Sequence, residues 1–381
     1  MLDRSYILQP FNGLLEQKHL IQAQCLNCGK CLLQCRFLKE HGTPGTLAAR
    51  HDDDPDTTAS AAYHCSLCSL CKAVCPEGLD PSAMFLEFRQ HAAANQQKPI
   101  SQHQGLINFE RRGTSKPYTL YSLPDNCDTI FFPGCNLTGT RPGNTLKTYQ
   151  YLQKKFKNIG IVLDCCTKLS HDLGRQNHFQ AMFSQLKSHL LDNHVQSVVL
   201  ACPGCHMVFS NYAREFNIKT VYEVMADQGV EFPARIEDTV AIHDPCTIRF
   251  NAPIQEAIRD IVSSLGISLI EPLHHKDRTF CCGQGGGAGC LAPELASTWT
   301  EKIDSECGAD KIISYCSGCI SSLSRKNRAI HLIDLVFNPE RALKGKAKVS
   351  RAPFTYLNRK RLKRKLKQLC SAKWFERGEK I

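Results

Sequence analysis

The sequence lacks any apolar run close to the roughly 18 residues that a membrane-spanning helix needs. Residues 1–24 also lack the basic segment and following apolar segment of a secretory signal. Outside the C-terminus there is no excess of positive charge, because residues 341–381 hold 15 of the 47 Lys and Arg but 2 of the 36 Asp and Glu. We therefore expect a cytoplasmic protein, or one attached peripherally to the inner face of the cytoplasmic membrane. A near-neutral body argues against nucleic acid as its partner.

Cysteine, in contrast, is abundant, at 22 of 381 residues. Disulfides explain such a content mostly in small secreted domains. This chain is long enough for two or three domains, and its hydrophobic content of 42% allows a packed core. We expect thiols that stay reduced and available to bind metal.

Two cysteine runs near the N-terminus share the spacing C-x2-C-x2-C-x3-C. The spacing is typical of bacterial two-cluster ferredoxins, in which the fourth cysteine of each run ligates the other cluster. Zinc sites prefer two separated C-x-x-C pairs. The prediction is two [4Fe–4S] cubane clusters, one held by Cys25, Cys28, Cys31 and Cys75 and the other by Cys65, Cys68, Cys71 and Cys35.

The segments around these runs suggest a small helical domain over residues 1–95. Helices are predicted over Gly13–Gln24 and over Pro81–Ala94, where Pro81 stands at a helix start. Residues 96–125 are polar and show little periodicity, so we expect a linker there.

A second cysteine pattern occurs twice: a lone Cys, then an adjacent pair, then C-x-x-C. The corresponding positions of the two sets are offset by 111, 116 and 114 residues. Five thiolates from three points of the chain suit an iron–sulfur core, because thiolate is the soft ligand that such cores require. The sets are Cys135, Cys165, Cys166, Cys202 and Cys205, and Cys246, Cys281, Cys282, Cys316 and Cys319.

Short apolar runs alternate with amphipathic stretches through both halves of the body, which predicts α/β lobes with largely parallel sheets. The predicted strands are 129–132, 159–163 and 195–200 in the first half, and 239–243, 267–270 and 311–315 in the second. Predicted helices cover 179–193, 254–265 and 293–306. Each lone Cys and each C-x-x-C follows a strand, so the five thiols of a lobe should meet at one sheet edge, where α/β proteins bind ligands. The duplication predicts two sites near a pseudo-twofold axis.

These residues resemble the cysteine-rich "CCG" domain pair of heterodisulfide reductases and of the iron–sulfur subunits of glycolate oxidase and anaerobic glycerol-3-phosphate dehydrogenase. The resemblance covers residues 20–335 and implies a ferredoxin domain (1–95), two CCG-type domains (126–235 and 236–340) and a basic tail (341–381). It further implies one or two additional [4Fe–4S] clusters of the noncubane type, held by the two five-cysteine sets. One departure is Thr167, where glycine usually follows the Cys pair.

The resemblance implies an oxidoreductase subunit that passes electrons through the two ferredoxin-type clusters to paired sites that reduce a disulfide. An alternative is an electron-relay subunit that links a flavoprotein dehydrogenase to membrane quinone. Either function needs a redox partner, which would be a flavoprotein or a cytochrome- or quinone-linked membrane protein. A third, non-redox alternative is a zinc-bound scaffold.

Other motifs have plainer explanations. Cys202-x-x-Cys205-His206 matches the c-type haem attachment sequence, but that chemistry needs export. The glycines of 283–289 follow a Cys pair rather than a strand, which favours close backbone approach to a cluster over a dinucleotide site. His243 stands three residues before Cys246 and is a candidate catalytic residue for proton transfer, with a structural role as the alternative.

The C-terminal tail contains a basic segment, 359–369. As a helix it places Leu362, Leu366 and Leu369 on one face and cations on the other, with Trp374 and Phe375 beyond. This pattern suggests an interfacial helix on anionic lipid or docking to an acidic partner, against the alternative of a solvated basic tail. The four cysteines outside all sets receive no role: Cys127, Cys290, Cys307 and Cys370.

Overall fold

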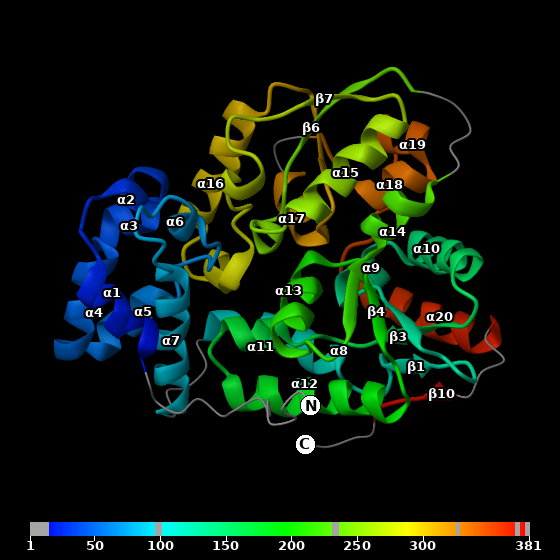
Figure 1. The fold of residues 1–381 in the computed structure, drawn as a ribbon, viewed down its shortest axis with the longest axis horizontal. Helices are drawn as coiled ribbons and strands as arrows, with labels where there is room; N and C mark the ends of the chain where they lie inside the picture. Colours follow the sequence, from blue (N-terminus) through cyan, green and yellow to red (C-terminus); the bar gives the residue numbers. More distant parts are fainter. Residues whose placement is uncertain (1–14, 96–100, 231–235, 325–327, 370–373, 378–381) are drawn as a thin grey trace.

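The computed structural model describes residues 15–95, 101–230, 236–324, 328–369 and 374–377. Figure 1 shows three parts: a helical N-terminal module in blue and cyan, a first α/β lobe mainly in green, and a second lobe in yellow and orange above it. The module lies beside both lobes, next to the region where they meet. The predicted fold class, a helical ferredoxin-type domain followed by two α/β lobes, is confirmed.

The N-terminal module is built from short helices whose starts are set by capping residues. Thr43, Asp54 and Asp80 each accept a backbone hydrogen bond from the first turn of the following helix, and each precedes a Pro at its first position. Met84, Phe85 and Phe88 form the buried face of the longest helix. The helices are α1 (Glu16–Gln24), α2 (Lys30–Gln34), α3 (Arg36–His41), α4 (Pro44–Asp53), α5 (Pro55–Ala62), α6 (Leu70–Ala73) and α7 (Pro81–Ala94).

The first lobe contains a six-stranded sheet in the order β10-β1-β3-β2-β4-β5. Four neighbouring strands of this sheet are parallel: β2 (Thr129–Phe132), β3 (Ile159–Leu163), β4 (Ser197–Leu200) and the edge strand β5 (Asn217–Thr220). Antiparallel strands β1 (Leu120–Ser122) and β10 (Trp374–Phe375) extend the other edge. The helices are α9 (Cys135–Thr140), α10 (Pro142–Lys155), α11 (Lys168–Asp172), α12 (Gln176–Asp192), α13 (Pro203–Tyr212) and α14 (Val221–Gln228).

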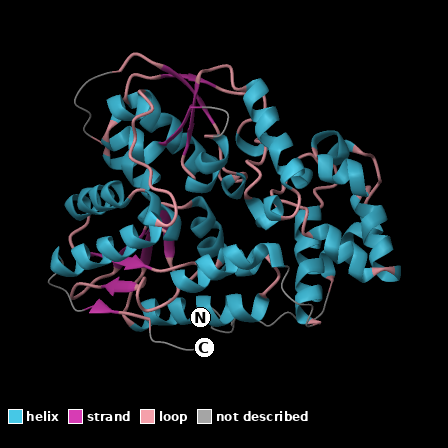
Figure 2. Ribbon diagram, turned by 180° about the vertical axis from the view of Figure 1, so that it is seen from behind, coloured by secondary structure: helices cyan, strands magenta, loops and turns pink. Residues whose placement is uncertain are grey.

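The second lobe repeats this arrangement with a smaller parallel sheet in the order β7-β6-β8-β9. Figure 2 shows the two sheets as separate groups of magenta strands. The strands are β6 (Thr239–Ile242), β7 (Ser268–Ile270), β8 (Lys311–Ser314) and β9 (Arg328–His331). The helices are the short 3-10 helix η2 (Cys246–Ile248), α15 (Ala252–Ser264), α16 (Pro293–Glu306), α17 (Ser317–Leu323), α18 (Leu332–Phe337) and α19 (Pro339–Leu343).

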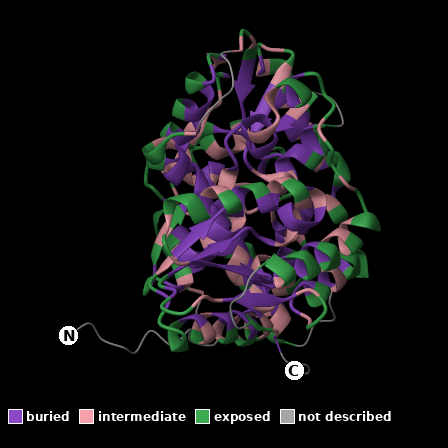
Figure 3. Cartoon of the chain, turned by 90° about the vertical axis from the view of Figure 1, so that its right-hand side faces the viewer, coloured by how far each residue is buried: buried purple, intermediate pink, exposed green. Residues whose placement is uncertain are grey.

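A continuous apolar core joins the two lobes. Residues of α14 in the first lobe and of α15 in the second belong to one buried cluster, and these two helices pack against each other. Figure 3 shows the strands of both lobes buried beneath a partly exposed layer of helices. A buried ion pair also crosses the junction, with Arg141 Nε 2.6 Å from Asp334 Oδ2. None of the helices in the described ranges is both long and apolar enough to cross a bilayer.

The segment expected to be a linker over 96–125 differs from that prediction. Its described part contains helix α8 (Gln104–Gly113) and strand β1. Glu110 is buried and accepts hydrogen bonds from the backbone N–H and the hydroxyl of Ser170. The polar composition that suggested a linker therefore includes polar side chains that are used inside the fold.

The C-terminal segment also differs from the predicted tail. The predicted helix exists as α20 (Phe354–Leu369), but it packs against α9 and α10 of the first lobe. Leu362 and Leu366 are 4% and 0% exposed, so the expectation that these leucines form a free apolar face was wrong. Trp374 and Phe375 pair with β1 as an edge strand.

Candidate metal centres

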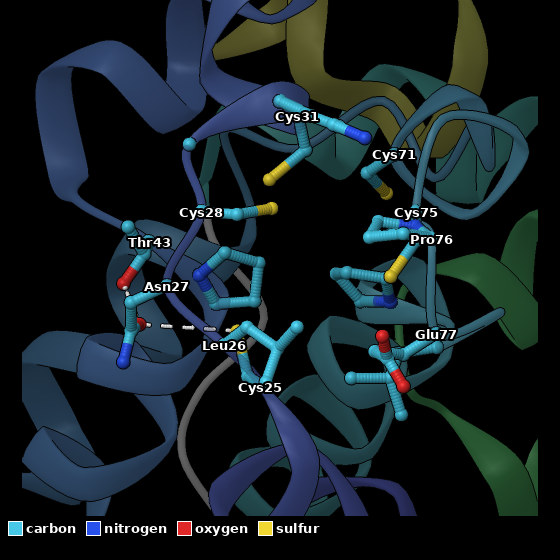
Figure 4. Close-up of a pocket in the computed structure, with 15 residues that line it drawn as sticks. Cys25, Leu26, Asn27, Cys28, Cys31, Thr43, Cys71, Cys75, Pro76 and Glu77 are labelled. Atoms are coloured by element: carbon cyan, nitrogen blue, oxygen red, sulfur yellow. Dashed lines mark hydrogen bonds between the residues drawn. The ribbon is translucent and has the colours of Figure 1, made fainter.

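The first N-terminal site is a pocket between α2 and the loop before α7. Its lining includes Cys25, Cys28, Cys31 and Cys75, the four sulfurs predicted to hold one cluster. Figure 4 shows the sulfurs of Cys28, Cys31 and Cys75 pointing toward one another. Burial, with the neighbouring Cys25, Cys28 and Cys75, raises the pKa of Cys31 to about 11. A bound cation would reverse this effect, because a coordinating thiol is deprotonated.

The second N-terminal site is a pocket that lies against α16 of the second lobe. Its lining includes Cys35, Cys65, Cys68 and Cys71, as the crossed ligation pattern predicts. Cys71 also lines the first pocket. Burial raises the pKa of Cys65 to about 12, and it likewise raises the pKa of Cys35 and Cys71. Each predicted set of four cysteines therefore lines one pocket, and Cys71 lines both.

The five cysteines of the first lobe converge at the carboxyl ends of β2, β3 and β4. Cys165 Sγ lies 3.9 Å from Cys135 Sγ, and Cys205 Sγ lies 3.2 Å from Cys166 Sγ. A hydrogen bond with Cys205 lowers the pKa of Cys202 to about 6. Gly134 has a left-handed φ of 80°, and a Cβ at this position would lie 2.9 Å from Cys202 Cβ. Glycine therefore allows the approach of the Cys135 turn to the C-x-x-C.

The five cysteines of the second lobe also converge. Cys281 interacts with Cys246 and Cys282, and Cys319 interacts with Cys282 and Cys316. The backbone N–H of Gly283 donates a 3.3 Å hydrogen bond to Cys281 Sγ, as predicted for backbone approach in this glycine-rich segment. Cys281 also interacts with Cys68, so the second ferredoxin-type site touches the second lobe's site.

The two five-cysteine sets face each other across the junction between the lobes. Helix α9, which begins with Cys135, packs against α17, which carries Cys319. In the reciprocal contact η2, which begins with Cys246, packs against α13, which carries Cys205. Tyr222 marks the junction, because its hydroxyl lies 3.1 Å from Ala201 O and 3.2 Å from Tyr315 O, the carbonyls just before the two C-x-x-C motifs.

Comparison with protein families matches this architecture part by part. Residues 21–79 match the 4Fe-4S dicluster domain, and residues 129–210 and 240–324 each match the cysteine-rich CCG domain. The chain belongs to the family of iron–sulfur proteins that join a 4Fe-4S dicluster domain to two CCG domains. The prediction made from the cysteine spacing is confirmed at this level.

Relatives of this CCG-family chain match most of its length at low sequence identity. A dihydromethanophenazine:CoB–CoM heterodisulfide reductase subunit from Methanosarcina barkeri is 22% identical over 79% of this chain and 88% of its own length. A fumarate reductase (CoM/CoB) subunit from Methanothermobacter marburgensis is 22% identical over 77% of this chain and 66% of its own length. EtfAB:quinone oxidoreductase of Syntrophomonas wolfei is 22% identical over 61% of this chain and 37% of its own length.

Among solved structures, an aspartate racemase homologue from Pyrococcus horikoshii aligns with 64% of this chain and 99% of its own length. The sequence identity is 16% and the TM-score is 0.23.

Two buried arginines that no sequence pattern singled out fix the ferredoxin module of this CCG protein to its lobes. Arg89 is fully buried and donates hydrogen bonds to the carbonyl oxygens of Ala62, Cys65, Asp172 and Gly286. These carbonyls belong to all three parts of the chain. Spacing could not reveal Arg89, because its partners lie up to 197 residues away.

The second of these residues, Arg249, is 2% exposed. It donates to the carbonyl oxygens of Cys68, Asp277 and Thr279 at 2.9, 2.5 and 2.7 Å. It therefore joins the Cys68 loop to the segment that leads into Cys281.

The surroundings of the five-cysteine sets fit an anionic cluster. Three buried polar atoms beside them have no hydrogen-bond partner within the described residues: Thr167 Oγ1, His243 Nε2 and Arg359 Nη1. Each can donate a hydrogen bond, and donors toward cluster sulfur are a feature of iron–sulfur sites. Thr167 and Gly283 both follow a Cys pair with left-handed φ, of 52° and 82°. Thr167 thus occupies a position that favours glycine.

The other residues noted in the sequence are two histidines and four unassigned cysteines. His243 is 4% exposed just after β6 and interacts with Cys282, so it lies at the second set as predicted. Its neighbour Asp244 accepts hydrogen bonds from Arg259 and Tyr315, which gives this carboxylate a structural role. His206 lies on α13, where its Nε2 is 3.4 Å from Ser210 Oγ. Of the four unassigned cysteines, Cys127 and Cys307 donate to backbone carbonyls, Cys290 is exposed, and Cys370 lies outside the described residues.

Proposed function

We propose that this chain is the iron–sulfur subunit of an oxidoreductase that reduces a disulfide at the junction of its two lobes. The observation that carries the proposal is that both five-cysteine sets are complete and face each other across this junction. Plain electron transfer needs four thiolates per cluster, so the fifth in each set supports a chemical role. The named activity of one relative, heterodisulfide reductase, is the same class of reaction.

The proposed cofactors are two [4Fe–4S] cubane clusters in the N-terminal module and a [4Fe–4S] cluster of the noncubane type in each lobe. Cys25, Cys28, Cys31 and Cys75 would hold the first, and Cys65, Cys68, Cys71 and Cys35 the second. Cys135, Cys165, Cys166, Cys202 and Cys205 would hold the third, and Cys246, Cys281, Cys282, Cys316 and Cys319 the fourth. Clusters at these positions would supply one-electron transfer and iron sites for disulfide sulfur.

The protein's own residues set the order of transfer in this proposal. The contact of Cys68 with Cys281 makes the second lobe the point of entry from the ferredoxin module. His243 Nε2 is placed to donate a hydrogen bond at that second set. Two electrons and two protons convert one disulfide into two thiols, so both sets facing the junction would contribute. The electron donor would be a redox partner protein, because the relatives named above are themselves parts of multi-subunit reductases.

The test is a turnover assay on the anaerobically purified chain, with reduced viologen dye as electron donor and a panel of low-molecular-weight disulfides as acceptors. We expect dye oxidation that depends on a disulfide and releases two thiols for every two electrons. A chain that contains its full iron but oxidises the dye with none of the disulfides would contradict the proposal.

A second candidate function is electron relay from a flavoprotein dehydrogenase to membrane quinone. One observation favours it: the exposed face of α20 carries Lys360, Arg361, Arg364 and Lys365 beside Phe354, which is 62% exposed. Cations next to exposed apolar side chains suit an anionic bilayer surface. Flotation with phosphatidylglycerol vesicles but not with phosphatidylcholine vesicles would support this function. Electron uptake restricted to a co-purifying flavoprotein would separate it from the first.

A further inference from the structure

The first five-cysteine set has a charged neighbour from a distant part of the chain. Arg359 lies on α20, beyond both matched CCG domains, and is 3% exposed. A Cβ built on Gly113 would lie 3.1 Å from Cys165 Cβ and 3.5 and 3.6 Å from Nη2 and Nη1 of Arg359. Because Gly113 has no side chain, nothing separates the guanidinium of Arg359 from the Cys165–Cys166 pair at this point.

Among the described residues no carboxylate forms an ion pair with Arg359, and Asp164, on which its charge acts, is already paired with Arg377. In that part of the chain Nη1 of Arg359 has no hydrogen-bond partner, and Nη2 makes one long bond of 3.4 Å to Gly113 O. The guanidinium lies over the rings of Phe109 and Tyr118, at 5.8 and 5.1 Å from their centroids. A buried cation with an unpaired donor is costly unless an anion compensates it.

Two other charged residues lie near the first five-cysteine set, and neither is an unpaired cation. Arg377 also approaches Cys165, but it forms a 3.0 Å ion pair with Asp164. Glu110 is the opposing charge, since it acts on both Cys135 and Cys165.

We propose that Arg359 is the counter-ion of the first five-cysteine set, a positioning residue whose fixed charge raises the reduction potential of the cluster held there. The proposal rests on the proposed function in that it requires a cluster in this set. Reduction adds negative charge to a buried centre, and a nearby cation stabilises the reduced form. This makes the first lobe the favoured end point for electrons that enter through the second lobe.

The test is a redox titration of the anaerobic full-length protein, monitored by electron paramagnetic resonance, with iron content measured on the same samples. Arg359→Met should lower the equilibrium constant for one-electron reduction of one lobe cluster at least tenfold, which is about 59 mV. Arg359→Lys should restore most of the potential, because it restores the charge. Glu110→Gln should shift the same signal in the opposite direction.

Lys363→Met is the matched control, because Lys363 is a buried cation one turn further along α20 whose charge is paired with Glu376 at 2.8 Å. It should leave both iron content and potential unchanged. Loss of about four irons from Arg359→Met, with full iron in Lys363→Met, would also support a counter-ion that holds an anionic cluster.

Wild-type protein and Arg359→Met that carry the same iron and titrate at the same potential would overturn the inference and leave the proposed function intact. Wild-type protein with iron for the ferredoxin-type clusters alone would instead contradict the proposed function.

Discussion

The guanidinium Nε of Arg249 donates a 2.9 Å hydrogen bond to the carbonyl oxygen of Cys68. Arg249 follows Cys246 by three residues in the second lobe, whereas Cys68 belongs to the ferredoxin module. The same guanidinium holds the carbonyls of Asp277 and Thr279, just ahead of Cys281. One side chain thus fixes the two loops whose sulfurs, of Cys68 and Cys281, come into contact.

Arg249→Met should therefore weaken both stability and electron transfer between module and lobe. Three carbonyl oxygens, two of them in buried hydrogen bonds and that of Asp277 in a partly buried one, would lose their donor. At about 1 kcal/mol each, we expect the free energy of unfolding to fall by about 3 kcal/mol. Stopped-flow reduction by viologen should show slower reduction of the lobe clusters than of the ferredoxin-type clusters. Arg249→Lys should restore stability and the reduction rate only in part, because an ammonium group cannot donate to three separate carbonyl oxygens as the guanidinium does.

Arg278→Met is the control for this prediction. Arg278 lies in the same loop, but it is half exposed and contacts Asp277 at 3.7 Å. Its substitution should leave both measurements close to those of the wild type. Equal reduction rates in wild type and Arg249→Met would show that Arg249 does not set the contact.

The sequence predicted the bounds of central strands well, and the structure brings the cysteines of each predicted set close together, for identifiable reasons. Strands β2 and β3 and helices α7 and α16 have the predicted bounds, since each is an apolar or periodic run ended by Gly, Pro or a polar residue. The cysteine sets were predictable because ligand spacing is local within each motif, and because strand ends place C-x-x-C motifs at a common sheet edge.

The parts that the sequence did not reveal depend on contacts between distant residues. Strands β5 and β9 are partly exposed edge strands with polar residues such as Asn217 and Arg328, so their apolar signal is weak. Glu110 and Arg359 look like surface residues in a polar helix, and their burial follows from packing against Ser170 and the Cys165 turn. A basic helix that lies against the body has the same local pattern as a free one.

The buried ion pair between the lobes should contribute strongly to their association. Arg141 and Asp334 are 2% and 3% exposed, and Asp334 Oδ1 also accepts a 2.8 Å hydrogen bond from Asn144. Asp334→Ala would leave the guanidinium buried without its partner, which costs about 3–5 kcal/mol. Urea unfolding followed by circular dichroism measures the change. Glu340→Ala, which removes an exposed pair with Lys344, is the control and should change stability little.

Acid should destabilise the N-terminal module through His51. Its ring is buried, stacks on Phe88 at 3.9 Å, and lies 2.6 Å from Thr58 Oγ through Nδ1. Burial, with the charges of His91 and Lys18, lowers the pKa of His51 to about 4. In the unfolded chain the pKa is about 6.5. Between these two values the unfolded chain binds a proton that the folded chain does not, so stability falls as the pH falls.

The expected loss from this residue is about 2 kcal/mol between pH 7 and pH 5. His51→Asn removes the titrating group and keeps a hydrogen-bonding amide near Thr58, so its unfolding free energy should depend less on pH by that amount. His19→Asn, at an exposed position of α1, should keep the wild-type dependence. An identical pH dependence in wild type and His51→Asn would show that His51 does not contribute.

The most direct test of the account is the iron content of the anaerobically purified chain compared with that of two cysteine variants. Four clusters predict about sixteen irons per wild-type chain and about eight in the quadruple variant Cys165→Ser, Cys166→Ser, Cys281→Ser, Cys282→Ser, which leaves too few thiolates in each lobe to hold a cluster. Cys307→Ser, a buried cysteine outside every set, should keep about sixteen. A wild-type chain with about eight irons, unchanged by the quadruple substitution, would contradict the claim that the two lobes hold clusters.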